Sequence, residues 1–232
     1  MTPLNNISDP SQENPILTAY ENYVGNTPLV TRSVLNLLTV SYLLSWLVDL
    51  EYALACIPQF VVHYFELHRL LTSVVVNQNL ISVVFACLAF LNAGKLLEDS
   101  LGSAAMAWLC GVVTVLTNTI FVAIEFLTFY VTDDSSLLLN SSSGIWVVLF
   151  GLIAMECSQA AQYQAKRRLF VFNVPTLFYP LALLALFSFL SARFQLSHAI
   201  STALGYGLGH GKLDLLKVRH SHAKALKNRV SF

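Results

Sequence analysis

Two side chains in the second half of the chain, Ser143 and His198, have the chemistry of a nucleophile and a base. Ser143 is the last of three consecutive serines, and an apolar run follows it directly; His198 also stands near the start of an apolar run. A serine becomes nucleophilic when a base within hydrogen-bonding distance accepts its proton. Both residues also have ordinary interpretations, because serine commonly caps a helix and histidine can place a polar tip at a membrane interface. The elements that position the two side chains decide between these interpretations.

The composition indicates a membrane protein. Hydrophobic residues make up 56% of the 232 residues and charged residues 11%, whereas about 25% of a typical soluble domain is charged. The apolar residues gather in blocks of about 17 to 25 residues, the length of a helix that crosses a bilayer. The formal net charge is zero, so overall charge indicates no partner, and no basic patch typical of nucleic-acid binding is visible. The sequence therefore predicts an all-α, polytopic membrane protein.

We expect six transmembrane helices. The predicted spans cover residues 32–49, 70–93, 103–131, 144–163, 174–192 and 196–211. Residues 51–67 are too polar to span but rich in aromatic side chains, which predicts an interfacial or re-entrant segment broken at Pro58. The chain thus divides into an N-terminal segment, residues 1–30, a six-span membrane domain, residues 31–211, and a basic tail, residues 212–232.

The lysines and arginines predict how the spans are oriented, because such residues concentrate on the cytosolic side. If the N-terminus is cytosolic, eleven of the 13 face the cytosol. These eleven are Arg32, Lys95, Lys166, Arg167, Arg168, Lys212, Lys217, Arg219, Lys224, Lys227 and Arg229. Arg69 and Arg193 then lie on the opposite side. We therefore expect both termini in the cytosol, with Ser143 and His198 starting their helices at matching depth on the luminal side.

Several segments resemble motifs of the rhomboid superfamily. The stretch from His68 to Ser103 is similar to the family's second-span region, with its aromatic-Arg-Leu-x-Thr start and Gly-x-x-Leu-Glu-x-x-x-Gly-Ser finish. The matching residues are Arg69, Leu70, Thr72, Gly94, Leu97, Glu98, Gly102 and Ser103. The segment SSSGIWVVLFG resembles the family's Gly-x-Ser-Gly helix start, with Ser143 as nucleophile, and HAISTALG resembles its His-x-x-Gly-x-x-x-Gly motif, with His198 as base. The segment NTPLVTR resembles the Pro-x-Val-Thr lead-in before the first span of the endoplasmic-reticulum rhomboids and their derlin relatives, and FVFNVP resembles their connection between the fourth and fifth spans.

The resemblance implies a six-helix rhomboid-like bundle and a Ser-His dyad that needs neither cofactor nor metal. The departures from the motifs concern the groups around the dyad. Ser141 replaces the first glycine of Gly-x-Ser-Gly, and Ser201 replaces the first glycine after the base. The family's oxyanion-stabilising histidine and asparagine fall on Ser82 and Ala86, and an earlier histidine falls on Asn77. Asn77 and Ser82 are thus the candidate oxyanion donors, in a family position where losing one donor typically costs about 10²–10³ in rate.

Small residues predict how the fourth and sixth spans pack. Gly144 and Gly151 lie two helical turns apart, and Gly205 and Gly209 have the small-xxx-small spacing that lets transmembrane helices approach closely. We expect these glycines to bring the two spans together. Ser143 should then cap the fourth helix, with its hydroxyl within about 4 Å of a ring nitrogen of His198, a distance that allows for the long hydrogen bonds of ligand-free sites.

Three classes of function remain open. The first is an intramembrane serine protease that cleaves transmembrane or membrane-proximal segments. The second is a catalytically inactive, derlin-like protein that binds membrane clients in protein quality control. The third is a transporter or channel, which the sequence disfavours because it shows no inverted repeat and only Glu125 and Glu156 lie well inside spans. Expected partners are transmembrane substrates or clients, the bilayer and quality-control machinery; the expected location is the endoplasmic reticulum, with the Golgi as the alternative.

Overall fold

The computed structural model describes residues 15–77, 79–160, 166–169 and 172–211, and over these residues the fold is helical apart from one hairpin. The predicted basic tail, residues 212–232, and residues 1–14 lie outside this part of the chain. The α-helices are α1 (Pro15–Asn26), α2 (Leu29–Leu44), α3 (Leu50–Leu54), α4 (Pro58–His63), α5 (Arg69–Thr72), α6 (Leu80–Leu101), α7 (Ser103–Thr132), α8 (Trp146–Ala160), α9 (Tyr179–Leu190) and α10 (Leu196–Gly209). The 3₁₀ turns are η2 (Ser73–Val75), η3 (Ser135–Leu139) and η5 (Thr176–Phe178), and strands β1 (Lys166–Leu169) and β2 (Phe172–Pro175) pair antiparallel.

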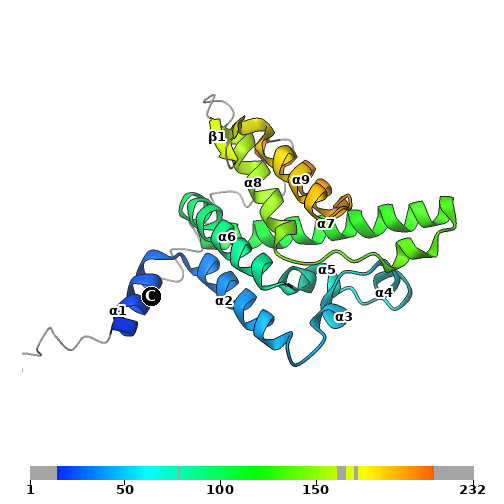
Figure 1. The fold of residues 1–232 in the computed structure, drawn as a ribbon, viewed down its shortest axis with the longest axis horizontal. Coiled ribbons are helices and arrows are strands. Elements are labelled where there is room, and N and C mark those ends of the chain that lie inside the picture. The colour runs from blue at the N-terminus through cyan, green and yellow to red at the C-terminus, as the bar shows by residue number, and fades with distance from the viewer. Residues whose placement is uncertain (1–14, 78, 161–165, 170–171, 212–232) are drawn as a thin grey trace, which may run out of the picture.

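Two of the helices are long and apolar enough to cross a membrane. They are α6, with 22 residues, and α7, with 30. A single residue, Gly102, separates them, and its φ of 86° lies in the left-handed region that favours glycine. The helices α2, α8 and α9 are apolar but shorter. Figure 1 shows α6 and α2 side by side, with α8 rising from the same region and α7 extending away from it.

The predicted second span, residues 70–93, is wrong in its position. Residues 69–75 form the separate short helices α5 and η2, and the long helix α6 runs from Leu80 to Leu101. Asn79 has an extended backbone, which interrupts the helix. The carbonyl of Leu70 accepts a hydrogen bond of 2.8 Å from the Asn118 amide of α7, so the first part of the predicted span is held against α7 as short helices separate from α6.

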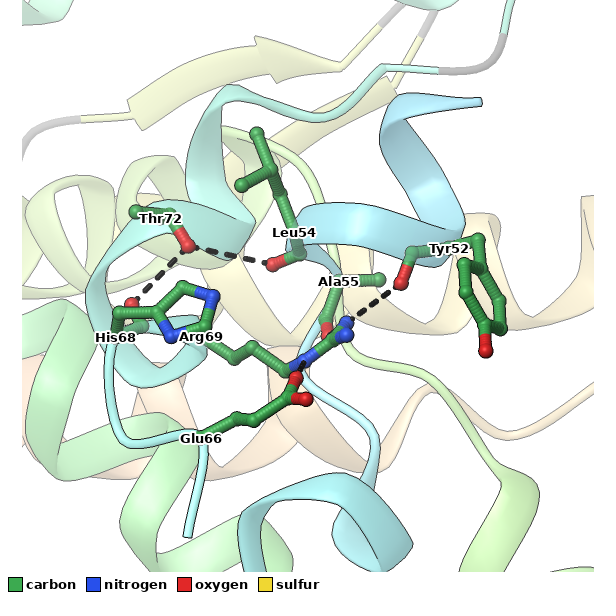
Figure 2. A network of polar contacts seen from close by, with 7 residues as sticks. All are labelled: Tyr52, Leu54, Ala55, Glu66, His68, Arg69 and Thr72. Atoms are coloured by element: carbon green, nitrogen blue, oxygen red, sulfur yellow. Dashed lines mark hydrogen bonds and ion pairs between the residues drawn. The ribbon is translucent and has the colours of Figure 1, made fainter. Parts of the chain in front are cut away.

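The predicted interfacial segment is a compact loop organised by Arg69. The Arg69 side chain is buried and donates to the carbonyls of Tyr52, at 2.8 Å, and Ala55, at 3.0 Å (Figure 2). It also pairs with Glu66 and lies 4.5 Å from the centre of the Phe60 ring. One guanidinium therefore joins α3, α4 and α5, and Pro58, predicted to break the segment, is the first residue of α4.

Glu98 joins α6 to the start of α2. Its carboxylate accepts hydrogen bonds from the backbone N–H groups of Val30, at 2.8 Å, and Thr31, at 2.7 Å, and from the Thr31 hydroxyl at 2.8 Å. The preceding residue, Pro28, offers no side-chain cap. A negative charge at a helix N-terminus also interacts favourably with the helix dipole. Glu98 thus fixes the position of α2 against α6.

The centre of the fold is α8, which packs against α6, α7, α9 and α10. Its side chains are buried on all sides of the helix; the most enclosed are Val147, Val148, Leu149, Phe150, Leu152 and Met155. A helix that is apolar all round is stable only when surrounded by other elements or lipid. This helix begins beside the serine run, so the packing of α8 locates the candidate site.

Candidate active site

Ser143 and His198 line one cavity of about 770 Å³. Its walls come from the segment before α8, the start of α10, the residues around the start of α6, and parts of α7 and α9. Asn77, Ser82 and Gly144 line the same cavity. Residues predicted for chemistry from three distant parts of the sequence therefore border a single space.

Ser143 lies outside the helix that it was predicted to cap. The α-helix begins at Trp146, so Ser143 belongs to an extended segment three residues earlier. Ser142 forms a β-bridge with Cys56, with backbone hydrogen bonds of 3.0 and 2.9 Å, and the Gly144 N–H donates to the Ser73 carbonyl at 2.9 Å. The serine is thus positioned by its two neighbours, each of which is tied to the loop between α2 and α6.

Gly144 does not share a helix face with Gly151, and that prediction is wrong because Gly144 precedes α8. Its φ is 92°, and a Cβ there would come within 3.3 Å of the Val76 carbonyl oxygen and 3.5 Å of Asn77 Oδ1. The residue therefore allows close approach to residues 76–77 and not to α10. The turn needs a glycine on both conformational and steric grounds.

The three serines of the run have different environments. Ser141 is exposed at the cavity, while Ser142 is buried and donates to Asn118 Oδ1 at 3.0 Å. Ser143 is half-buried, and within the described residues neither its N–H nor its hydroxyl forms a hydrogen bond. Ser141 and Ser143 therefore both border the cavity with a hydroxyl and a backbone N–H unused within the described residues, and Ser143 is the half-buried one of the two.

His198 is enclosed by aromatic rings on the opposite wall. Only 8% of its surface is exposed, and its ring centre lies 4.9 Å from that of Phe150 and 6.2 Å from that of Phe187. The Nδ1 atom lies 3.5 Å from the Ser197 hydroxyl, which leaves Nε2 without a partner among the described residues. No hydrogen bond joins this ring to Ser143 across the described part of the chain.

The candidate oxyanion donors are held in different ways. Asn77 is buried, and its amide nitrogen donates to the Val75 carbonyl at 3.3 Å. The Ser82 hydroxyl accepts a hydrogen bond of 3.0 Å from Trp146 Nε1, and the centre of the Trp146 ring lies 4.6 Å from that of Phe187, with the ring planes tilted. Within the described residues the Ser82 hydroxyl proton has no acceptor, so it can donate to an oxygen in the cavity.

The remaining predicted glycines lie where α8 and α10 touch. A Cβ on Gly205 would clash with the Gly151 carbonyl and with Ala154 Cβ at 2.8 Å, and one on Gly151 would lie 2.8 Å from Ser201 Oγ. A Cβ on Gly209 would meet the Ser158 side chain and the Met155 carbonyl at 2.8 Å. The backbones of α8 and α10 therefore approach more closely than side chains at these positions would allow.

One residue that sequence reasoning left out of the site is Glu125 of α7. Its side chain lines the cavity with only 7% of its surface exposed, and it accepts a hydrogen bond of 3.2 Å from the Asn140 amide. Glu51 and Arg193 line the cavity as well. The sequence did contain a signal for Glu125, because an ionisable residue inside a predicted span is a functional candidate in its own right.

Comparison with known proteins places the chain in a family. Residues 32–211 match the family model of the eukaryotic integral membrane proteins designated DUF1751. The chain belongs to this family. The membrane class predicted for this DUF1751 protein from its composition is thereby confirmed.

This DUF1751 protein is also similar to Rhomboid-like protein 15 of Arabidopsis thaliana. The two are 27% identical over 197 residues, which cover 82% of this chain and 48% of the relative. The chain therefore spans about half the length of this curated relative. The distant similarity agrees with the rhomboid resemblance that the motifs indicated.

Proposed function

We propose that the protein is a rhomboid-like intramembrane serine protease that cleaves transmembrane or membrane-proximal segments. The observation that supports this best is that Ser143 and His198, 55 positions apart in the sequence, border one cavity. In this proposal α2, α6, α7, α8, α9 and α10 span the membrane, both termini are cytosolic and the cavity opens to the lumen of the endoplasmic reticulum or, alternatively, the Golgi.

The proposed chemistry uses the atoms that the described residues leave unpaired. Ser143 Oγ attacks the carbonyl carbon of the substrate peptide bond, and its proton passes to His198 Nε2. The oxyanion accepts hydrogen bonds from the Ser143 N–H and from Ser82 or Asn77. His198 then gives the proton to the leaving amine as the C–N bond breaks, and a water molecule, deprotonated by the same ring, releases the acyl group from Ser143. The ring and the hydroxyl must approach when substrate binds, since catalytic hydrogen bonds often tighten only in the complex.

A fluorophosphonate that reacts with activated serines tests the proposal on the detergent-solubilised protein. We expect labelling of the wild type and of Ser141→Ala, and none of Ser143→Ala or His198→Ala. The Ser141 variant is a matched control, because it removes an exposed hydroxyl from the same run. Absence of labelling in a protein whose thermal unfolding shows it to be folded would contradict proteolysis.

A second candidate, a catalytically inactive client-binding protein, is favoured by two specific observations. Ser143 and His198 are not hydrogen-bonded, and Ala86, at a family donor position, is fully buried and has no polar side-chain atom. In this function the cavity holds a membrane segment without cleaving it and presents it to quality-control machinery. A folded, unlabelled protein that still binds a transmembrane peptide would establish this function in place of the first.

A further inference from the structure

The wall of the cavity contains a buried carboxylate that has no cationic partner among the described residues. Glu125 is more than nine-tenths buried, and its Oε1 accepts one hydrogen bond, of 3.2 Å, from the neutral amide of Asn140. The ion pair found in the described part of the chain joins Arg69 to Glu66 and leaves Glu125 out. A buried carboxylate is costly unless it is paired with a cation or protonated.

A cation of this chain does border the cavity, but it does not neutralise Glu125. Arg193 lies in the turn between α9 and α10, is exposed, and forms no ion pair with Glu125. Glu51 lines the same cavity and adds a second carboxylate. Among the described residues, Glu125 therefore borders the cavity without a cation paired to it.

A second acceptor, independent of the carboxylates, lies at the cavity: the Oδ1 atom of Asn77. Asn77 has 6% of its surface exposed and lines the cavity. Its amide nitrogen bonds to Val75, whereas its Oδ1 accepts no hydrogen bond within the described residues and lies near Gly144, beside Ser143. A ligand group with a positive charge and several N–H donors supplies what each of these two acceptors lacks.

We propose that Glu125, with Asn140 holding it and Asn77 as a neutral acceptor, forms a subsite for a lysine or arginine side chain of the segment that the cavity receives. This inference rests on the proposed function only in that the cavity takes a membrane-proximal segment, whether or not it is cleaved. A hydrogen bond between charged groups removed from water is among the strongest that a site can offer, so the subsite selects basic residues.

The test uses the full chain with Ser143→Ala, reconstituted in lipid nanodiscs, so that the peptide is not consumed. The probes are three fluorescent transmembrane peptides that differ at one membrane-proximal position, which carries lysine, norleucine or glutamate. Binding is followed by fluorescence anisotropy. We expect the lysine peptide to bind about tenfold more tightly than the norleucine peptide, as a charge-assisted hydrogen bond predicts, and the glutamate peptide to bind more weakly than either.

The variant Glu125→Gln should remove the preference for lysine, while Asp133→Asn should retain it. Asp133 is a matched control, because it is an exposed carboxylate at the end of the same helix and asparagine tolerates its left-handed backbone. Equal affinity for the lysine and norleucine peptides would overturn the subsite while leaving the cavity as a binding site. If Glu125→Gln does not fold, the affinities of the lysine, norleucine and glutamate peptides for the Ser143→Ala protein still test the subsite. Failure of all three peptides to bind would refute the proposed function, and the subsite with it.

Discussion

The contact between Gly205 and α8 gives a prediction whose size follows from the structure. Replacing Gly205 with alanine adds a Cβ that would lie 2.8 Å from Ala154 Cβ and 2.9 Å from the Gly151 carbonyl carbon, with the carbonyl oxygen closer still. Ordinary van der Waals contact begins at 3.4 Å, so the helices must separate by at least 0.6 Å. A gap of about 0.5–1 Å forfeits a quarter to a half of the dispersion energy between facing atoms.

The obstructing atoms are backbone atoms of Gly151 and the Cβ of Ala154, and none of them can rotate away. We therefore expect Gly205→Ala to cost about 2–3 kcal/mol, toward the upper part of the range for overpacked sites. This corresponds to a fall in Tm of about 5–10 °C for a chain of this size. The separation also moves His198 away from Ser143, so fluorophosphonate labelling should fall with it.

Thermal unfolding in detergent, followed by a dye, measures the change. The matched control is Gly111→Ala in α7, because a Cβ there meets nothing within 4 Å. Alanine has the higher helix propensity, by up to about 1 kcal/mol, so the control should leave Tm unchanged or raise it. A Gly205→Ala protein as stable as the control would refute the close approach of α8 and α10.

Three other changes have defined outcomes. Arg69→Lys should lower the free energy of unfolding by about 2–3 kcal/mol. The reason is that an ammonium group cannot reproduce the planar fork whose Nη1 serves the carbonyls of Tyr52 and Ala55 while its Nε serves Glu66. Urea unfolding measures the loss, and an unchanged midpoint would contradict the role given to Arg69. Glu98→Gln removes the charge and one of two acceptors at the start of α2, so a loss of about 1–3 kcal/mol is expected, and normal protease resistance of α2 would argue against it. Cys56 is fully buried, and burial raises its thiol pKa to about 12. Since only the thiolate reacts, maleimide should leave Cys56 unmodified between pH 7 and about 8.5 until the protein is unfolded. Rapid labelling of Cys56 in the folded protein would show the loop to be open.

The apolar helices were predictable from sequence because their signal is local. The predicted spans 103–131 and 196–211 correspond closely to α7 and α10, since uninterrupted apolar runs end there at polar or glycine-rich residues. The second span failed because apolar residues 70–76 resemble a helix in composition. What holds them apart from α6 is the amide of Asn118, which bonds to the Leu70 carbonyl from 48 positions away and cannot be read from any local pattern.

The candidate site was predictable in its membership more than in its geometry. Motif spacing led to Ser143 and His198, and the cavity contains both. The backbone around Ser143 could not be predicted, because a serine followed by glycine and an apolar run is equally compatible with a helix cap. The pairing of Ser142 with Cys56 decides against the cap. It is an isolated β-bridge outside any sheet, so no strand pattern in the sequence announces it. Glu125 was visible as a charge within a span, but its place in the cavity depends on how α7 crosses α10.

The attachment of Ser142 to Cys56 and of Gly144 to Ser73 has a consequence for how relatives of this protein can differ. Both residues that hold the serine segment, Cys56 and Ser73, belong to the connection between α2 and α6. This connection, and not α8, therefore determines the position of the Ser143 hydroxyl. Insertions or substitutions in residues 50–75 can redirect Ser143 without altering any residue of the serine motif itself. Under the proposed function, divergence in activity among relatives is therefore expected to follow the loop sequence, and chimeras that exchange this loop alone test it.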